Sequence, residues 1–439
     1  MNHPLRDVLP MRCELGADGH LRLGGCDATE LAGQYGTPLY VYDVGTMRAM
    51  CQDFVREFGA RYPDTRVLYA SKAYLGPAMA RLVADEGLGM DVVSGGELAV
   101  ARAVDFPPED IFFHGNNKSP AEVAEALDYG IGRFVVDSFY ELEMVDEMAR
   151  ERGVVQPIML RLSPGIDAHT HAKTTTGILD TKFGFPIETG DAARAIHSAL
   201  DASHLDLTGI HIHLGSPIFE LEPYALGIDT VLTFLSPFRD EGLDLRDFSP
   251  GGGFAVGYVR DRLPPPISAY ADVIARTVRD RCRDLGFGEF RLLVEPGRSI
   301  VARAGVALYT VGGVKAIPGL RRYVSVDGGM GDNIRPALYD AKYEAMLANR
   351  AADGNSENVR IVGKYCETGD ILVKDVELPS PRTGDLVAIP GSGAYGISMA
   401  GNYNLNPRPA VVMVEDGESR LVRRRETYED LMAVELDGG

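Results

Sequence analysis

The stretch VLYASKAYLGPAMARLVADEGLGMDVV, residues 67–93, contains the pattern that decides the fold. Short apolar runs at its two ends predict strands over Val67–Ala70 and Met90–Val93. Between them, residues 75–87 carry apolar side chains at helical spacing and end at a glycine. A strand, a helix and a second strand in this order form the repeating unit of a parallel sheet.

The same alternation continues to residue 298. Residues 119–130 start with Ser119, Pro120 and Glu122, which is a typical helix N-terminus. Six further strands are predicted at Ile111–Phe113, Phe134–Val136, Ile158–Leu162, Leu207–His213, Asp247–Ser249 and Leu292–Val294. Eight strand–helix units predict a closed (β/α)8 barrel of the TIM type rather than an open sheet.

The pattern changes after Gly305. Short β-type runs separated by turn residues replace the helices, and VVMVEDGESRLVRRR (411–425) reads as a hairpin. We therefore expect an α/β barrel over residues 38–304. A second, all-β domain, sandwich-like or barrel-like, is expected from both chain ends, residues 1–37 and 305–439.

Composition excludes several classes of protein. The 439 residues carry a formal net charge of −19, which argues against a nucleic-acid or anionic-membrane partner. The five cysteines are scattered and lack zinc-site spacing, so neither a disulfide framework nor a metal finger is expected. No signal peptide and no run of ~20 apolar residues is apparent. We expect a cytoplasmic protein without a membrane partner.

Polar residues follow the predicted barrel strands, and barrel enzymes place their chemistry at these C-terminal strand ends. The candidates are Lys72, Asp91, His114, Arg161, His213, Ser216, Gly252, Gly253, Glu295, Gly297 and Arg298. Desolvation makes a lysine amine at such a position nucleophilic, which is what Schiff-base chemistry requires. The ordinary alternative is a lysine at the barrel rim, paired with Asp91 or Glu97.

Two glycine-rich stretches need separate interpretations. Gly251-Gly252-Gly253 could present bare N–H groups to a phosphate, with Arg298 and Ser216 assisting, or could form only a tight turn. Residues 391–396 match G-x-G-x-x-G formally but no helix follows, so a dinucleotide site is not expected there. A loop that presents Tyr395 to a site is the better interpretation.

Two His-x-His pairs, 169/171 and 211/213, have the spacing of metal ligands on a strand. They leave open a metal-dependent barrel hydrolase. Because further ligands at other strand ends are missing, we expect no metal.

Two polar clusters lie in the predicted β domain. Cys366 and Glu367 fall in a polar loop, although a lone cysteine is more often a small buried apolar residue. Arg335 and Tyr339 form the other cluster, which a purely structural interpretation would assign to a salt-bridged surface.

Taken together, the motifs resemble the fold-type III pyridoxal phosphate (PLP) decarboxylases. The similarity covers nearly the whole chain, with ten runs in the expected order. These are YASKA (69–73), GLGMDVVSGGELAVA (87–101), FHGNNKS (113–119), TKFGF (181–185), GIHIHLGS (209–216), GGGFAV (251–256), EPGRSIVARAG (295–305), IRPALYD (334–340), CETGD (366–370) and GAYG (393–396) with NYN (402–404).

The resemblance implies a role for each candidate residue. Lys72 would hold pyridoxal 5'-phosphate in a Schiff base, Glu295 would pair with its ring nitrogen and His213 would stack on the ring. Asp91, His114 and Arg161 would support the lysine and the cofactor. The phosphate and substrate end would be surrounded by Ser216, Gly252, Gly253, Gly297, Arg298 and Tyr395. Arg335, Tyr339 and Glu367 would bind substrate, together with Arg298 and Tyr395. Cys366 would donate a proton from the second subunit of a homodimer with shared sites.

The substrate implied is meso-2,6-diaminopimelate, which would yield L-lysine and carbon dioxide at the last step of lysine biosynthesis. Its distal carboxylate suits a bidentate arginine, and Arg335 is the candidate. The alternatives are a sister decarboxylase acting on ornithine, lysine, arginine or another amino acid, and a non-catalytic regulator.

Overall fold

The computed structural model describes residues 3–166, 181–351 and 355–436. The chain divides into two compact units, which are described separately below. One comprises Cys51–Ala255 and Pro265–Gly297, and the other comprises Met1–Met50, Val256–Pro264 and Arg298–Gly439.

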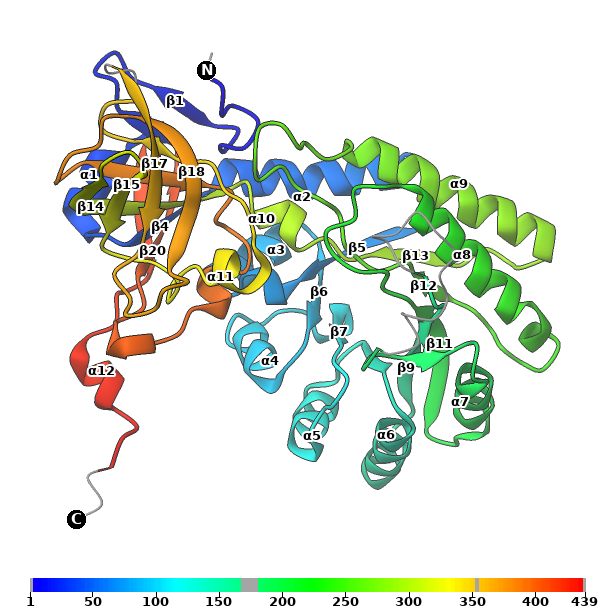
Figure 1. Cartoon of the computed structure of the whole chain (residues 1–439). Coiled ribbons are helices and arrows are strands. Elements are labelled where there is room, and N and C mark those ends of the chain that lie inside the picture. The colour runs from blue at the N-terminus through cyan, green and yellow to red at the C-terminus, as the bar shows by residue number, and fades with distance from the viewer. Residues whose placement is uncertain (1–2, 167–180, 352–354, 437–439) are drawn as a thin grey trace. The chain divides into compact units, whose positions relative to one another are not determined.

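Eight parallel strands of the first unit close into a barrel, as the sequence predicts (Figure 1). They follow one another around the barrel in chain order, and the pairing of β13 with β5 and of β8 with β9 completes the ring. The strands are β5 (Thr65–Ala70), β6 (Gly89–Val92), β7 (Ile111–Phe113), β8 (Arg133–Val136), β9 (Gln156–Ser163), β11 (Leu205–His211), β12 (Asp247–Ser249) and β13 (Arg291–Val294). The two-residue strand β10 (Phe185–Pro186) pairs with β9 outside this ring.

Helices connect the barrel strands. They are α3 (Pro77–Asp85), α4 (Gly95–Arg102), α5 (Pro120–Tyr129), α6 (Phe139–Arg152), α7 (Asp191–Asp201), α8 (Glu222–Leu235) and α9 (Ile267–Leu285), and α2 (Val44–Gly59) precedes β5. The predicted start of α5 is confirmed, because Ser119 and Glu122 form a reciprocal capping box. Gly130 then ends that helix in the left-handed conformation, with φ 78°.

The barrel strands contribute a common apolar cluster. Leu68, Phe112, Val135, Met159 and Leu293, from five different strands, are all buried together. Branched and aromatic side chains of this kind fill the interior of such barrels, so the strand ends rather than a central pore carry the polar groups.

The second unit is built around a nine-stranded sheet whose central path runs β18-β17-β15-β14-β4-β20-β21. Its strands are β4 (Leu39–Asp43), β14 (Gly305–Ile317), β15 (Arg321–Val326), β16 (Met346–Leu347), β17 (Ser356–Val362), β18 (Ile371–Pro379), β19 (Leu386–Pro390), β20 (Ala410–Glu415) and β21 (Glu418–Arg423). The predicted hairpin is β20–β21, and its turn has left-handed residues at Asp416 and Gly417. A β domain made from both chain ends is therefore confirmed.

The N-terminal residues pack on this sheet. They form the small sheet β1 (Cys13–Leu15), β2 (Leu21–Leu23) and β3 (Cys26–Asp27), followed by α1 (Ala28–Tyr35). Leu5, Leu9 and Leu31 belong to the same buried cluster as Val306 and Val412. Short helices α10 (Arg298–Val301), α11 (Arg335–Tyr339) and α12 (Tyr428–Met432) complete the unit.

The division of the chain differs from the expected boundaries at residues 38 and 304. Residues 38–50, 256–264 and 298–304 group with the sheet unit rather than with the barrel. For β4 the reason is its hydrogen bonding, because it pairs antiparallel with β14 and parallel with β20. Among the residues that the structure describes, every helix is too short or too polar to cross a lipid bilayer.

Candidate active site

Lys72 lies on a single 3-10 turn, Ser71–Ala73, directly after β5. Its Nζ donates a hydrogen bond of 2.6 Å to Oδ2 of Asp91, which is fully buried on β6. The neighbouring strands create this pair, because Ala70 and Asp91 are partners in the β5–β6 register. Of the two acidic partners that the sequence left open, Asp91 makes the ion pair with the lysine, whereas Glu97 accepts the N–H of Val93.

Glu295 follows β13 and is buried among hydrogen-bonding groups. Ser249 Oγ donates to Glu295 Oε1 at 2.6 Å, and His211 Nε2 lies 3.2 Å from Oε2. Burial alone would raise the pKa of Glu295, but His211 and His114 outweigh burial and lower the pKa to about 2. The carboxylate is therefore negatively charged at neutral pH.

His114 and His213 are kept neutral at the same strand ends. Burial lowers the pKa of His114 well below its ordinary value, and the ring packs edge-on against His211 at 4.9 Å. Burial also lowers the pKa of His213 to about 3, with Arg161 and Lys72 adding to the effect. Neither imidazole carries a charge at neutral pH.

Arg161, on β9, is enclosed rather than exposed. Its guanidinium lies 4.3 Å above the Phe183 ring, and its Nε is 3.8 Å from Oδ1 of Asp137. Burial lowers the pKa of Arg161, although an arginine stays charged at any physiological pH. It supplies a fixed positive charge that helps to lower the pKa of His213.

The structure does not support the two His-x-His pairs as metal ligands on a strand. His169 and His171 lie outside the described residues, and β11 ends at His211, so His213 does not share a strand face with it. Ligand atoms of His114, His211 and Glu295 do converge within 4.8 Å of one another. In the structure Glu295 is already hydrogen-bonded within this cluster, to Ser249 through one oxygen and to His211 through the other.

The glycines at 251–253 meet the backbone of neighbouring strand ends. A Cβ at Gly252 would lie 2.2 Å from the carbonyl oxygen of Glu295, and one at Gly253 would lie 2.4 Å from that of Gly215. A Cβ at Gly297 would likewise lie 2.8 Å from the Ala70 carbonyl oxygen. Tight packing therefore already requires glycine here, and it brings these loops together at the ends of the strands.

A second polar cluster lies in the sheet unit. The Arg335 guanidinium is buried 4.4 Å above the Tyr258 ring and hydrogen-bonds to the Tyr343 hydroxyl. Arg298 donates to the Tyr258 hydroxyl at 2.8 Å and lies 4.7 Å from the Tyr395 ring. Arg335 forms no ion pair with a carboxylate in the described part of the chain. The alternative in which Arg335 and Tyr339 belong to a salt-bridged surface is therefore wrong for Arg335.

Tyr258, which was not among the predicted site residues, lies between the two arginines and contacts both. A tyrosine shortly after the triple glycine has no local signature that marks it as a contact for Arg335. The link exists only in the folded chain, because residues 256–264 join the sheet unit.

Three other candidates are not gathered into either cluster. Tyr339 is 62% exposed, and Cys366 and Glu367 are exposed in a loop of the sheet unit. The loop that the polar neighbours of Cys366 predict is confirmed, and the cysteine is exposed rather than a small buried apolar residue.

The barrel site has the donor set that a pyridoxal group requires. The Lys72 amine stands beside the buried Asp91 carboxylate, and the ionised Glu295 carboxylate lies near the neutral His114. Asp91 Oδ1 and His114 Nε2 are buried without a hydrogen-bond partner in the described residues. Because buried polar atoms are normally paired, these two atoms fit a polar ligand in the site.

Comparisons with known proteins agree with this chemistry. Residues 44–302 match the family model described as "Pyridoxal-dependent decarboxylase, pyridoxal binding domain". The chain belongs to the pyridoxal-dependent decarboxylases and uses pyridoxal phosphate as its cofactor.

Relatives within the family are diaminopimelate decarboxylases. The chain is 48% identical to the diaminopimelate decarboxylase of Bacillus subtilis (strain 168) over 419 residues, 95% of each chain. A crystal structure of the enzyme from M. jannaschii in co-complex with L-lysine matches with a TM-score of 0.91 at 36% identity, covering 97% of both chains. The Helicobacter pylori enzyme complexed with L-lysine matches with a TM-score of 0.84 at 33% identity, covering 93% of this chain and 98% of that one.

Proposed function

We propose that the chain decarboxylates meso-2,6-diaminopimelate to L-lysine and carbon dioxide, the last step of lysine biosynthesis. The observation that carries the choice of substrate is the buried guanidinium of Arg335, which forms no ion pair with a carboxylate in the described residues. A distal substrate carboxylate would pair with it, and arginine binds carboxylates in a bidentate manner. The relatives named above include two that were crystallised with L-lysine, the product of this reaction.

Pyridoxal phosphate supplies an electron sink for the charge left when carbon dioxide departs. We assign its covalent attachment to Lys72, with Asp91, His114 and Arg161 supporting the lysine and the cofactor. The ionised Glu295 would hold a proton on the ring nitrogen, and neutral His213 would stack on the ring without adding charge. Its phosphate and the adjoining substrate end would be held by Ser216, Gly252, Gly253, Gly297, Arg298 and Tyr395.

The substrate would be held by Arg335 together with Tyr339, Glu367, Arg298 and Tyr395. Orientation matters because the bond to the departing carboxylate must lie perpendicular to the cofactor ring. Two guanidinium groups fixed on Tyr258 are suited to hold a doubly carboxylated substrate in one orientation.

We assign proton delivery to the Cys366 thiol and infer a homodimer in which each Cys366 serves the other subunit's site. The exposure of Cys366 and Glu367 on their own chain supports this arrangement. We also place the enzyme in the cytoplasm, since all five cysteines are free thiols, as is usual in a reducing compartment.

The decisive experiment supplies the purified protein with meso-diaminopimelate, L-lysine, L-ornithine and L-arginine and identifies the products. The proposal predicts a yellow protein that releases carbon dioxide and L-lysine from meso-diaminopimelate at least about 100-fold more efficiently than it decarboxylates the others. Preferred decarboxylation of ornithine, lysine or arginine would replace the proposed substrate. A protein that binds pyridoxal phosphate but decarboxylates none of the four would contradict the proposed function.

A further inference from the structure

The backbone of Cys366 is held by a neighbouring loop of the same chain. Its N–H donates to Asn404 Oδ1 at 2.8 Å, and its carbonyl oxygen accepts from the Tyr403 hydroxyl at 3.4 Å. Both polar backbone groups of an exposed residue are thus bonded to two consecutive side chains. A solvent-exposed loop does not need such bonds for solvation, because water could replace them.

The residues beside Cys366 are fixed as well. The Tyr365 ring stacks on Tyr403, with 6.2 Å between ring centroids and 15° between the ring planes. The buried Asp370 carboxylate accepts the N–H of Tyr365 at 2.9 Å and that of Met330 at 2.7 Å. Tyr365 and Asp370 therefore anchor the loop around Cys366, which fixes the position from which the thiol projects.

Asn404 adopts a left-handed backbone conformation that residues other than glycine rarely adopt. Its φ and ψ are 52° and 26°, and Leu405 follows with φ 53°. Left-handed backbone is strained for a residue other than glycine and persists where the surroundings enforce it. Asparagine tolerates this region better than most residues, and this conformation places its amide oxygen at Cys366.

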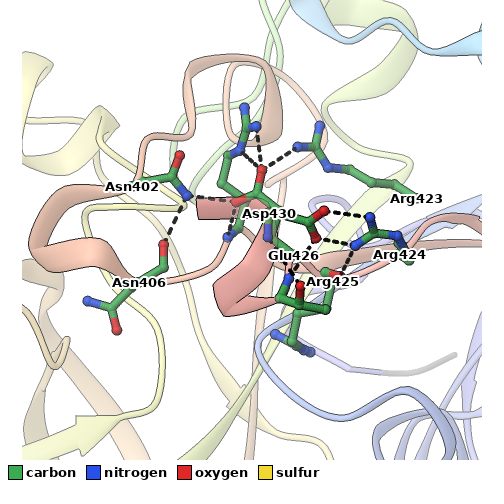
Figure 2. A network of polar contacts seen from close by, with 9 residues as sticks. Asn402, Asn406, Arg423, Arg424, Arg425, Glu426 and Asp430 are labelled. Atoms are coloured by element: carbon green, nitrogen blue, oxygen red, sulfur yellow. Dashed lines mark hydrogen bonds and ion pairs between the residues drawn. The ribbon is translucent and has the colours of Figure 1, made fainter. Parts of the chain in front are cut away.

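The loop that contains Asn404, residues 402–406, is anchored to the C-terminal segment through Asn402, as Figure 2 shows. Asn402 Nδ2 donates to Glu426 Oε2 at 2.7 Å and to the Asn406 carbonyl oxygen at 3.1 Å. Glu426 also accepts the N–H of Arg408 at 2.8 Å and pairs with its guanidinium. Burial opposes ionisation of Glu426, but these hydrogen bonds outweigh it and lower its pKa to about 2, so the anchor is charged at neutral pH.

We propose that Asn404 is a positioning residue for the proton donor, acting through its hydrogen bond to the Cys366 backbone. The inference rests on the proposed function, in which the Cys366 S–H bond breaks as a C–H bond forms at the substrate carbon that has lost carbon dioxide. The thiolate then recovers a proton from water. Asn404 touches neither substrate nor cofactor in this scheme and fixes only where the thiol points.

Two substitutions separate the hydrogen bond from the backbone strain. Asn404→Gly keeps the left-handed backbone at no steric cost and removes the acceptor, whereas Asn404→Asp keeps an acceptor oxygen at the same place. We expect Asn404→Gly to lower kcat on meso-diaminopimelate about 10-fold or more while KM changes less than about 2-fold. Asn404→Asp should stay within about 3-fold of wild type.

A matched control uses Asp105, an exposed left-handed residue of the barrel unit with φ 55°. Asp105→Gly introduces the same glycine far from Cys366 in the sequence and should leave kcat unchanged. If Asn404→Gly retained wild-type kcat, or if Asn404→Asp lost as much kcat as the glycine variant, the positioning role would be wrong.

The double variant tests whether Asn404 acts through Cys366. Added to Cys366→Ala, Asn404→Gly should lower kcat no further, because the group that it positions is already gone. A further loss of about 10-fold in the double variant would overturn the proposal.

A readout without substrate distinguishes this inference from the proposed function. In the proposed dimer Cys366 lies at the partner subunit's site, so the rate of its alkylation by iodoacetamide, followed by peptide mass spectrometry, should rise about 3-fold in Asn404→Gly, since the released loop leaves that site more often. Asp105→Gly should alkylate at the wild-type rate. An unchanged rate in Asn404→Gly would refute the inference even if wild type releases carbon dioxide from meso-diaminopimelate. A wild-type enzyme inactive on that substrate would refute only the proposed function.

Discussion

The amine of Lys72 lies 2.6 Å from Oδ2 of Asp91, at the ends of two adjacent barrel strands. Asp91 is fully buried, so the pair brings a charged amine against a carboxylate that water does not reach. An ion pair next to an apolar interior is costly to desolvate and is more often retained for chemistry than for stability. It fixes the lysine tip where the cofactor would be attached.

Replacing Lys72 by alanine should give a colourless protein that releases no carbon dioxide, because the covalent attachment point is lost. Absorbance of the purified protein and a carbon dioxide assay measure the two effects. Borohydride reduction of the wild type should also leave the pyridoxyl group on the peptide that contains Lys72. The exposed Lys315 supplies a control, since Lys315→Ala should remain yellow and active. A yellow, fully active Lys72→Ala variant would contradict the assigned attachment.

The charge of Glu295 should matter more than its hydrogen bonds. Its pKa of about 2 keeps it ionised, whereas Glu295→Gln is neutral but nearly isosteric. We expect the glutamine variant to remain yellow while kcat falls about 100-fold, because the ring nitrogen loses its charged partner. Ser249→Ala removes one donor to the same carboxylate and should cost less than about 10-fold. Equal losses in both variants would show that hydrogen bonding, and not charge, is what the site needs.

Much of the barrel could be predicted because its signals are local. The capping residues Ser119 and Glu122 and the left-handed Gly130 lie within one helix, so the sequence alone places α5. Lys72 and Asp91 could be predicted as neighbours, since consecutive parallel strands pair and their C-terminal ends lie together.

Relations between distant segments could not be predicted in the same way. Tyr258 contacts Arg335 only because residues 256–264 leave the barrel and join the sheet unit. The convergence of His114 and His211 on Glu295 likewise depends on strand order and on where β11 ends, which periodicity leaves uncertain by about 2–4 residues. The bond from Cys366 to Asn404 spans 38 residues and no motif in either segment predicts it.

Arg335 should discriminate between substrates by their distal group. Arg335→Ala is expected to lower kcat/KM for meso-diaminopimelate about 100-fold, because a charge-assisted pair with the distal carboxylate is lost. L-Lysine has no distal carboxylate, so any slow decarboxylation of it should fall by much less. Arg335→Lys keeps the charge without the bidentate fork and should be intermediate. An equal loss on both substrates would assign Arg335 a purely structural role.

Stability should fall at mildly acidic pH through His114. Burial holds its folded pKa well below the ordinary value of 6.5, so below that pH the unfolded chain binds a proton that the folded chain does not. This residue alone should lower the free energy of unfolding by up to about 1.4 kcal/mol per pH unit. Between pH 6.5 and pH 4.5 the stabilisation from Glu295 is essentially intact, because it is lost only as the pH falls from about 4.5 toward 2, so urea unfolding of His114→Asn should show a shallower pH dependence than wild type in this window.

Sharing of sites between subunits can be decided by mixing two inactive variants. Lys72→Ala lacks the attachment point and Cys366→Ala lacks the proton donor, so each homodimer should be inactive or nearly so. If Cys366 serves the other subunit, a mixed dimer combines Lys72 of one chain with Cys366 of its partner and regains one intact site of two. Unfolding and refolding an equimolar mixture should then restore about a quarter of wild-type activity, since half of randomly assembled dimers are mixed. Activity no greater than that of the separate variants would place Cys366 at the site of its own chain, because every site in the mixed dimer would then lack one group.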